Sequence, residues 1–167
     1  MVLILMGVSG SGKTTVGKEL ARLLKWPFFE ADEYHPPSNL AKMSSGKPLS
    51  EEDRLLWLQI LSGLIRKWLS RDENALLACS ALSRRSRCLL RGKSQPVRFV
   101  YLKGARGLIR QRLAARQGHF MPSGLLDSQF EALQAPRNAL VADAAASPQK
   151  IAQQVADWLA DEDAECC

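Results

Sequence analysis

The sequence begins with an unbroken apolar run that stops at a glycine-rich loop, and a helical pattern follows directly. Met1–Met6 contains no polar side chain, which indicates a strand buried on both faces of a parallel sheet rather than a signal peptide. The loop GVSGSGKT over 7–14 matches the P-loop pattern, and apolar residues recur at helical spacing over Lys13–Lys25. This order of strand, loop and helix is the context that the pattern requires. It predicts a binding site for nucleotide phosphates.

Each residue type in the loop has a chemical task. Glycines let backbone N–H groups curl around phosphates, and the new helix points the positive end of its dipole at them. Lys13 can reach the β- and γ-phosphates of ATP, and the Thr14 hydroxyl can bind Mg²⁺. A flexible glycine–serine linker, the alternative, would not lie between a buried strand and a helix. The predicted nucleotide-binding residues are Gly7, Val8, Ser9, Gly10, Ser11, Gly12, Lys13, Thr14 and Thr15.

Strand and helix patterns alternate along the rest of the chain. Four more strands are predicted, at Pro27–Glu30, Ala75–Cys79, Val97–Leu102 and Ala139–Ala142. Helices are predicted at Ser83–Arg91, Ala105–Arg116, Leu125–Leu133 and after Ser147. A long helix is predicted after Ser50, where Asp53 completes a capping box. Its buried face is expected to contain Trp57, Leu61, Leu64, Ile65 and Trp68. A loop is expected at Gln117–Gly124. The fold expected is a three-layer α/β sandwich around a parallel five-stranded sheet.

Length and composition narrow the class of protein. A chain of 167 residues predicts one domain, and no apolar run approaches the roughly 20 residues that span a bilayer. The four cysteines lack metal-ligand spacing, so we expect reduced thiols and a cytoplasmic protein. Eleven basic residues and no acid lie between Arg84 and Arg116. That block leaves a non-catalytic, nucleotide-dependent nucleic-acid-binding protein as a remote alternative, although it lacks interleaved aromatic residues.

Among P-loop proteins, the residues favour a small-molecule kinase. No Asn-Lys-x-Asp motif for reading guanine is present, which weighs against a GTPase. The third predicted strand ends at Cys79-Ser80, where ATPases usually place an acid. The nearest carboxylate at a strand end is Asp32, after the second strand. A kinase whose aspartate addresses an acceptor hydroxyl fits this arrangement.

Further motifs resemble those of the gluconokinases, small relatives of shikimate and adenylate kinases. The resemblance runs from Leu3 to about Leu159 and rests on GVSGSGKTT at 7–15, DEYHP at 32–36, NLAKM at 39–43, CSAL at 79–82, GHF at 118–120 and QFE at 129–131. It implies a P-loop kinase fold with a mobile lid at about 112–126 and ATP-dependent phosphorylation of D-gluconate to 6-phospho-D-gluconate. It also implies Mg²⁺ as cofactor and a homodimer. A kinase for another small hydroxy acid, such as shikimate, is the alternative.

The resemblance also implies roles for individual residues. Lys13, Asp32 and Arg116 are the expected catalytic residues, and Arg112 joins the P-loop in holding ATP. The expected acceptor-binding residues are Asp32, His35, Arg54, Ser80, Arg87 and His119. Asp32, His35, Arg54 and Ser80 fall at or after the points where parallel strands release the chain, the edge at which α/β proteins bind ligands.

Simpler interpretations stay open for several of these side chains. Asp32 could cap a helix, His35 could be an ordinary loop histidine, and Arg54 could be a solvated helix residue. Arg112 and Arg116 share one helix face, which favours a joint role over a solvated basic face. After CSAL the family usually has a lysine and a tyrosine where this chain has Ser83 and Ser86, so the preferred sugar acid is left open; Arg84 is the nearest replacement cation.

Overall fold

Five parallel strands form the centre of the molecule in the order β2-β3-β1-β4-β5. The computed structural model describes residues 1–47, 49–92, 96–115 and 123–165, and their side chains except those at 123–124 and 162–165. The sheet matches the prediction. Its strands are β1 (Val2–Met6), β2 (Phe28–Glu30), β3 (Ala75–Ala78), β4 (Val97–Lys103) and β5 (Leu140–Asp143).

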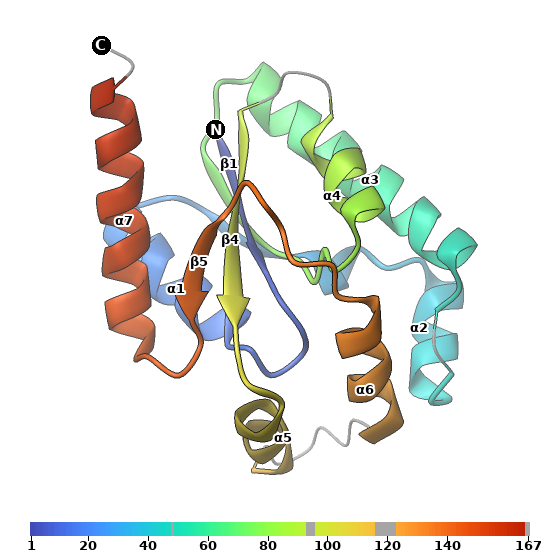
Figure 1. Cartoon of the computed structure of the whole chain (residues 1–167). Coiled ribbons are helices and arrows are strands. Elements are labelled where there is room, and N and C mark those ends of the chain that lie inside the picture. The colour runs from blue at the N-terminus through green and yellow to red at the C-terminus, as the bar shows by residue number, and fades with distance from the viewer. Residues whose placement is uncertain (48, 93–95, 116–122, 166–167) are drawn as a thin grey trace.

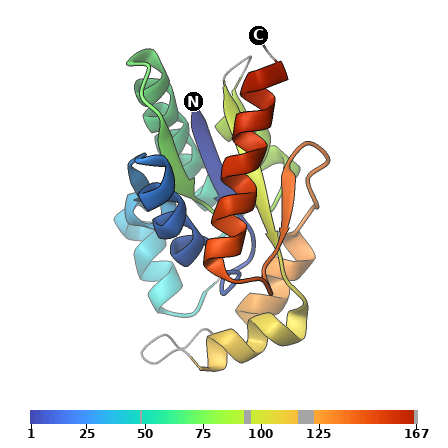
Figure 2. The ribbon, with the colours of Figure 1, turned by 90° about the vertical axis from the view of Figure 1, so that its left-hand side faces the viewer.

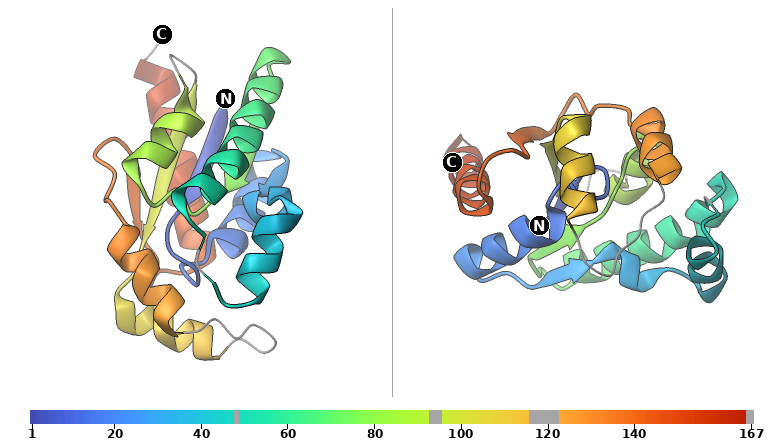
Figure 3. Two further views of the ribbon diagram at one scale, coloured as in Figure 1. Left: turned by 90° about the vertical axis from the view of Figure 1, so that its right-hand side faces the viewer. Right: turned by 90° about the horizontal axis from the view of Figure 1, so that it is seen from below.

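Helices cover both faces of this sheet, so the three-layer prediction is confirmed. α1 (Lys13–Leu24) and α7 (Pro148–Glu165) pack on one face (Figure 2). α3 (Glu51–Ser70) and α4 (Arg84–Arg91) pack on the other (Figure 3). The remaining elements are the 3₁₀ helix η1 (Ala31–Tyr34), α2 (Pro37–Ser44), α5 (Arg106–Ala114) and α6 (Ser123–Ala132). None of the described helices is long and apolar enough to cross a bilayer.

The central strand β1 explains why the first apolar run has no polar position. All five of its residues are fully buried, and successive side chains point to opposite faces of the sheet. Val2, Ile4 and Met6 join the core under α3, whereas Leu3 and Leu5 join the core under α1 and α7. Each buried leucine stabilises the fold by about 1.5–3 kcal/mol.

The long helix α3 begins and packs as its sequence predicts. The Ser50 hydroxyl accepts a hydrogen bond from the Asp53 N–H at 3.2 Å, and the Asp53 carboxylate accepts one from the Ser50 N–H at 2.9 Å. This capping box satisfies two N–H groups at the helix start. Trp57 and Trp68 are core residues, as expected.

One helix was not predicted, and one predicted loop needs correction. The sequence predicts no element over 37–44, but α2 begins there with Pro37 in the first helical turn, where a missing N–H costs nothing. α6 begins at Ser123, so the predicted loop over 117–124 ends earlier than expected. The rest of that loop, 117–122, lies outside the described residues.

The chain leaves β1, β2 and β3 at one edge of the sheet, the lower edge in Figure 1. The P-loop follows β1, Asp32 follows β2 and Ser80 follows β3. α5 lies across this edge when the molecule is seen from below (Figure 3, right). The topology therefore brings the P-loop, Asp32 and Ser80 to one end of the molecule.

Candidate active site

The P-loop curls back over the start of α1. Gly7 has φ of 148°, and a Cβ there would come within 2.9 Å of the Leu102 carbonyl oxygen, so only glycine fits. The amine of Lys13 donates hydrogen bonds to the carbonyls of Gly7 and Val8, both at 3.0 Å. No side chain caps the N-terminus of α1, which leaves the first N–H groups of that helix to an anionic ligand.

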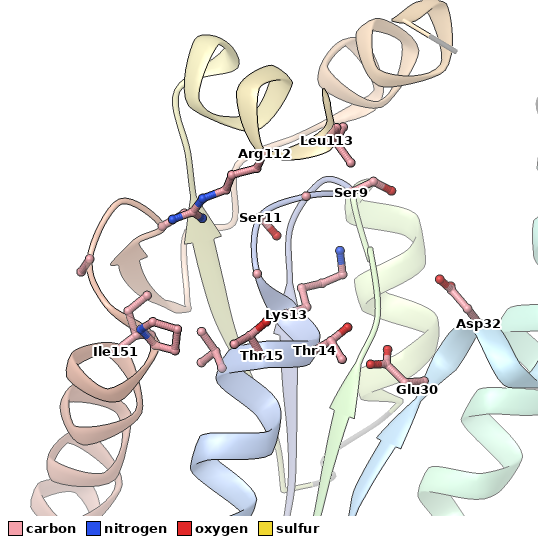
Figure 4. A pocket seen from close by; sticks show the side chains of 16 residues that line it. Ser9, Ser11, Lys13, Thr14, Thr15, Glu30, Asp32, Arg112, Leu113 and Ile151 are labelled. Atoms are coloured by element: carbon pink, nitrogen blue, oxygen red, sulfur yellow. The ribbon is translucent and has the colours of Figure 1, made fainter. Parts of the chain in front are cut away.

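A cavity of about 310 Å³ opens beside the loop. Glu30 and Asp32 lie on one side of it, and Arg112 and Ile151 lie on the other (Figure 4). The predicted nucleotide-binding residues Ser9 to Thr15 and Arg112 all line this cavity. Gly7 and Val8 do not line it, but their carbonyls hold Lys13. Cations, helix N–H groups and two carboxylates thus share one site.

Asp32 belongs to η1, and a side chain of α3 holds this turn in place. The indole N–H of Trp57 donates to the Ala31 carbonyl at 2.8 Å, and this contact fixes the residue before Asp32. The Asp32 side chain is 83% exposed and its carboxylate lies 3.9 Å from Nε2 of His35. A solvent-facing carboxylate on a fixed turn is free to meet a substrate.

His35 lies behind Asp32 and outside the cavity. Its ring is buried and stacks on Trp57 with centroids 4.2 Å apart, and its Nδ1 lies 3.4 Å from the amide nitrogen of Asn39. Burial lowers the pKa of His35, and the nearby Asp32 carboxylate opposes this shift only partly. We therefore expect a neutral imidazole that supports Asp32.

Glu30 is a site residue that the sequence analysis missed. It ends β2, lines the same cavity as the P-loop, and buries one carboxylate oxygen, Oε1, without a hydrogen-bond partner. A buried carboxylate oxygen without a partner is costly unless a cation or donor completes it. The signal was present in the sequence, because Glu30 and Asp32 flank the strand end two residues apart.

Arg54 and Ser80 do not line the cavity. Arg54, in the first turn of α3, pairs with the Glu51 carboxylate at 3.3 Å. The Ser80 carbonyl accepts a hydrogen bond from the Gly7 N–H at 3.3 Å, so Ser80 is a direct neighbour of the P-loop.

Arg87 points away from this cavity. Its Nη1 donates to the carbonyls of Ala81 and Leu82, at 3.0 and 2.9 Å, and the residue lines a second cavity behind α4. Arg84 lines that second cavity too. Arg116 and His119 lie outside the described residues.

Gln129 of α6 clamps the P-loop and was not predicted to do so. Its side-chain oxygen accepts a hydrogen bond from the Ser9 N–H at 2.7 Å, and its NH₂ group donates to the Ser9 hydroxyl at 3.1 Å. The two residues are 120 positions apart, so local pattern could not reveal the pair. These two hydrogen bonds connect the P-loop to α6, whose first residues belong to the expected lid.

Known proteins share this fold and much of the sequence. The family model described as shikimate kinase matches residues 9–165. The gluconokinase of Gluconobacter oxydans is 46% identical over 134 residues, which cover 80% of this chain and 75% of that protein.

Two solved structures agree with these matches. A sugar kinase from Janibacter sp. HTCC2649 is 38% identical with a TM-score of 0.88, covering 95% of this chain and 93% of that one. A gluconokinase from Sinorhizobium meliloti 1021 is 41% identical with a TM-score of 0.80, covering 91% and 87%. The chain therefore belongs to the shikimate kinase family of P-loop kinases and, within it, to the gluconokinases.

Proposed function

We propose that this kinase transfers the γ-phosphoryl group of ATP to the 6-hydroxyl of D-gluconate, giving 6-phospho-D-gluconate and ADP. The observation that carries the proposal is that the P-loop, Glu30 and Asp32 line the same cavity. Similarity to relatives named gluconokinases supports gluconate as the acceptor.

ATP binding would use the loop and both walls of the cavity. The N–H groups at the start of α1 face the phosphates, and Lys13 exchanges the carbonyls of Gly7 and Val8 for phosphate oxygens. Arg112 adds a second cation beside the loop. Pro148 and Ile151 form an apolar wall for the base.

The residues present fit Mg²⁺. Thr14 supplies a hydroxyl and Glu30 a buried carboxylate oxygen without a partner, both in the same cavity. The described residues contain no group of three His, Cys, Asp or Glu that would hold a metal alone, and Mg²⁺ usually takes one or two protein ligands with the phosphates. When bound, Mg²⁺ neutralises charge on the transferring phosphoryl group.

Asp32 is the proposed catalytic base. Phosphoryl transfer has a loose transition state, so the carboxylate first orients the acceptor hydroxyl by accepting its hydrogen bond and takes the proton late. Arg54 would exchange Glu51 for the gluconate carboxylate, and Ser80 would face the hydroxyls. His35 positions Asp32, and Arg87 holds the loop after Ser80.

The remaining features of the proposal come from the family resemblance. Arg116, His119 and a lid over about 112–126 would close on ATP within a single domain, 1–167. A homodimer is proposed as well; Leu56 and Ile60, one turn apart on α3, are exposed apolar side chains that a second copy could cover. A cytoplasmic location is proposed too, supported by the free thiols of Cys79 and Cys88.

The test is an ADP-release assay with ATP, Mg²⁺ and one acceptor at a time. We expect release with gluconate and none above background with shikimate, glycerate or AMP. Phosphorus NMR of the product should show the ester on C6. A folded protein that binds ATP and releases ADP only with shikimate would replace the gluconate proposal with the shikimate alternative.

A further inference from the structure

A second cavity, of about 520 Å³, lies between α4 and the segment 134–138 that joins α6 to β5. Figure 3 (left) shows α4 next to this segment. Phe99 of β4 lies at its base, and the two cavities share no lining residue. It is lined by Arg84, Arg87, Cys88, Arg91, Phe99, Gln134, Ala135, Pro136, Arg137 and Asn138. We call it the arginine pocket.

Four guanidinium groups face the arginine pocket, and none of the described residues that line it is acidic. Arg84 and Arg137 have no ion-pair partner among the described residues. Three arginines outside the pocket do: Arg85 pairs with Glu51, and Arg106 and Arg110 pair with Asp127. The arginine pocket therefore gathers guanidinium groups with no carboxylate among its described lining residues to balance them.

The lowered pKa of Arg87 indicates that negative charge is lacking around its guanidinium. Burial lowers the pKa of its guanidinium; the neighbouring Cys88 opposes this shift, while the positive charges of Arg84 and Arg91 add to it. The guanidinium carbon of Arg91 lies over the Phe99 ring, 5.3 Å from its centroid, so this cation is held against the base of the pocket. An anion bound here would relieve repulsion that the folded chain leaves uncompensated.

We propose that the arginine pocket binds a small organic anion with two charged groups, of the class of sugar bisphosphates and phosphorylated sugar acids. Arg84 on α4 and Arg137 on the opposite segment would each hold one anionic group. The amides of Gln134 and Asn138 would bond hydroxyls between them. Phe99 is only 2% exposed and cannot stack on a base, so a nucleic acid fits less well.

Arg87 connects the arginine pocket to the loop beside the P-loop, so its variants would mix two effects. Its guanidinium donates hydrogen bonds to the carbonyls of Ala81 and Leu82. Ala81 has φ of 43°, a backbone conformation that residues other than glycine rarely adopt. Arg84 and Arg137 make no such contact, and the test therefore uses these two.

The experiment is calorimetric titration of fructose 1,6-bisphosphate into the full chain with its P-loop saturated by MgADP. We expect one-to-one binding that weakens at least about tenfold in Arg84→Ala/Arg137→Ala, because this variant removes both proposed charge-assisted contacts. Arg84→Lys/Arg137→Lys keeps both charges and should retain most of the affinity. Lys18→Ala/Arg22→Ala removes two cations from α1, on the other face of the sheet, and should bind like the wild type.

Three results would overturn the proposal. Equal affinity in the alanine variant and the wild type would place the anion elsewhere. Inorganic phosphate binding as tightly as the bisphosphate would exclude a two-group ligand. Binding of a single-stranded oligonucleotide that depends on Arg84 and Arg137, without bisphosphate binding, would make this a nucleic-acid surface. None of these results depends on gluconate being the acceptor.

Discussion

The two cavities hold their cations in different ways. Lys13 is held by two carbonyls of its own loop, at 3.0 Å each, so one short stretch of sequence builds the contact. The arginine pocket is assembled from segments about 50 residues apart, and Gln134 joins them by accepting a hydrogen bond from the Arg84 N–H at 2.7 Å. A contact made within one motif can be predicted from sequence, whereas a contact assembled by folding cannot.

The largest expected effect is at the motif. Lys13→Met removes the amine that meets the phosphates, and we expect kcat for gluconate-dependent ADP release to fall on the order of a thousandfold. Steady-state kinetics with a thermal melt as the folding control would measure it. A folded Lys13→Met protein with near-normal kcat would show that the loop amine does not contribute to transfer.

Glu30→Gln should change the magnesium dependence. The variant keeps the shape of the side chain but loses the charge that we assign to the metal, so the Mg²⁺ concentration at half-maximal rate should rise about tenfold or more. Asp32→Asn is the matched control, and its Mg²⁺ requirement should barely move. If excess Mg²⁺ instead restores Asp32→Asn and has no effect on Glu30→Gln, the roles of the two carboxylates are reversed.

Gln129→Leu tests a contact between the P-loop residue Ser9 and a helix that is distant in sequence. Loss of both hydrogen bonds to Ser9 should loosen the loop and lower kcat/KM for ATP about tenfold, because small displacements at a reacting centre are costly. Ser9→Ala removes only the weaker, side-chain bond and should stay within about threefold of the wild type. Equal losses in the two variants would contradict a role for the backbone bond.

The smallest effect is on stability and comes from His35. Because burial lowers its pKa in the folded protein below the ordinary 6.5, the unfolded chain takes up the proton first as pH falls. The contribution of neutral His35 to stability is complete above pH 6.5 and is lost below it. The Tm advantage of the wild type over His35→Gln should therefore shrink between pH 7.5 and pH 5, measured by calorimetry. A constant difference would mean that the ring is protonated without cost.

Much of the fold could be predicted because its signals are local. The five strands are short apolar runs bounded by turns, and β1 is buried on both faces as its sequence indicates. The start of α3 was readable from Ser50 and Asp53, since a capping box involves neighbours only. The P-loop contacts follow from a pattern of eight residues.

The parts that could not be predicted depend on tertiary contacts. Gln129 reaches Ser9 only after 120 residues have folded between them. The buried oxygen of Glu30 requires the packing around β2, and Arg87 turns from the first cavity toward the carbonyls of Ala81 and Leu82. The residue types indicated which side chains could bind phosphate or metal, but tertiary packing decided which partners they contact.

The most direct test of the account is a kcat comparison between two variants in one gluconate-dependent ADP-release assay. Asp32→Asn removes the proposed base from the P-loop cavity, and Arg84→Ala/Arg137→Ala removes two charges from the arginine pocket. We predict that Asp32→Asn loses about a hundredfold or more in kcat, while the double variant stays within about threefold of the wild type. A double variant that loses as much as Asp32→Asn would place the arginine pocket in the reaction and contradict the separation of the two sites.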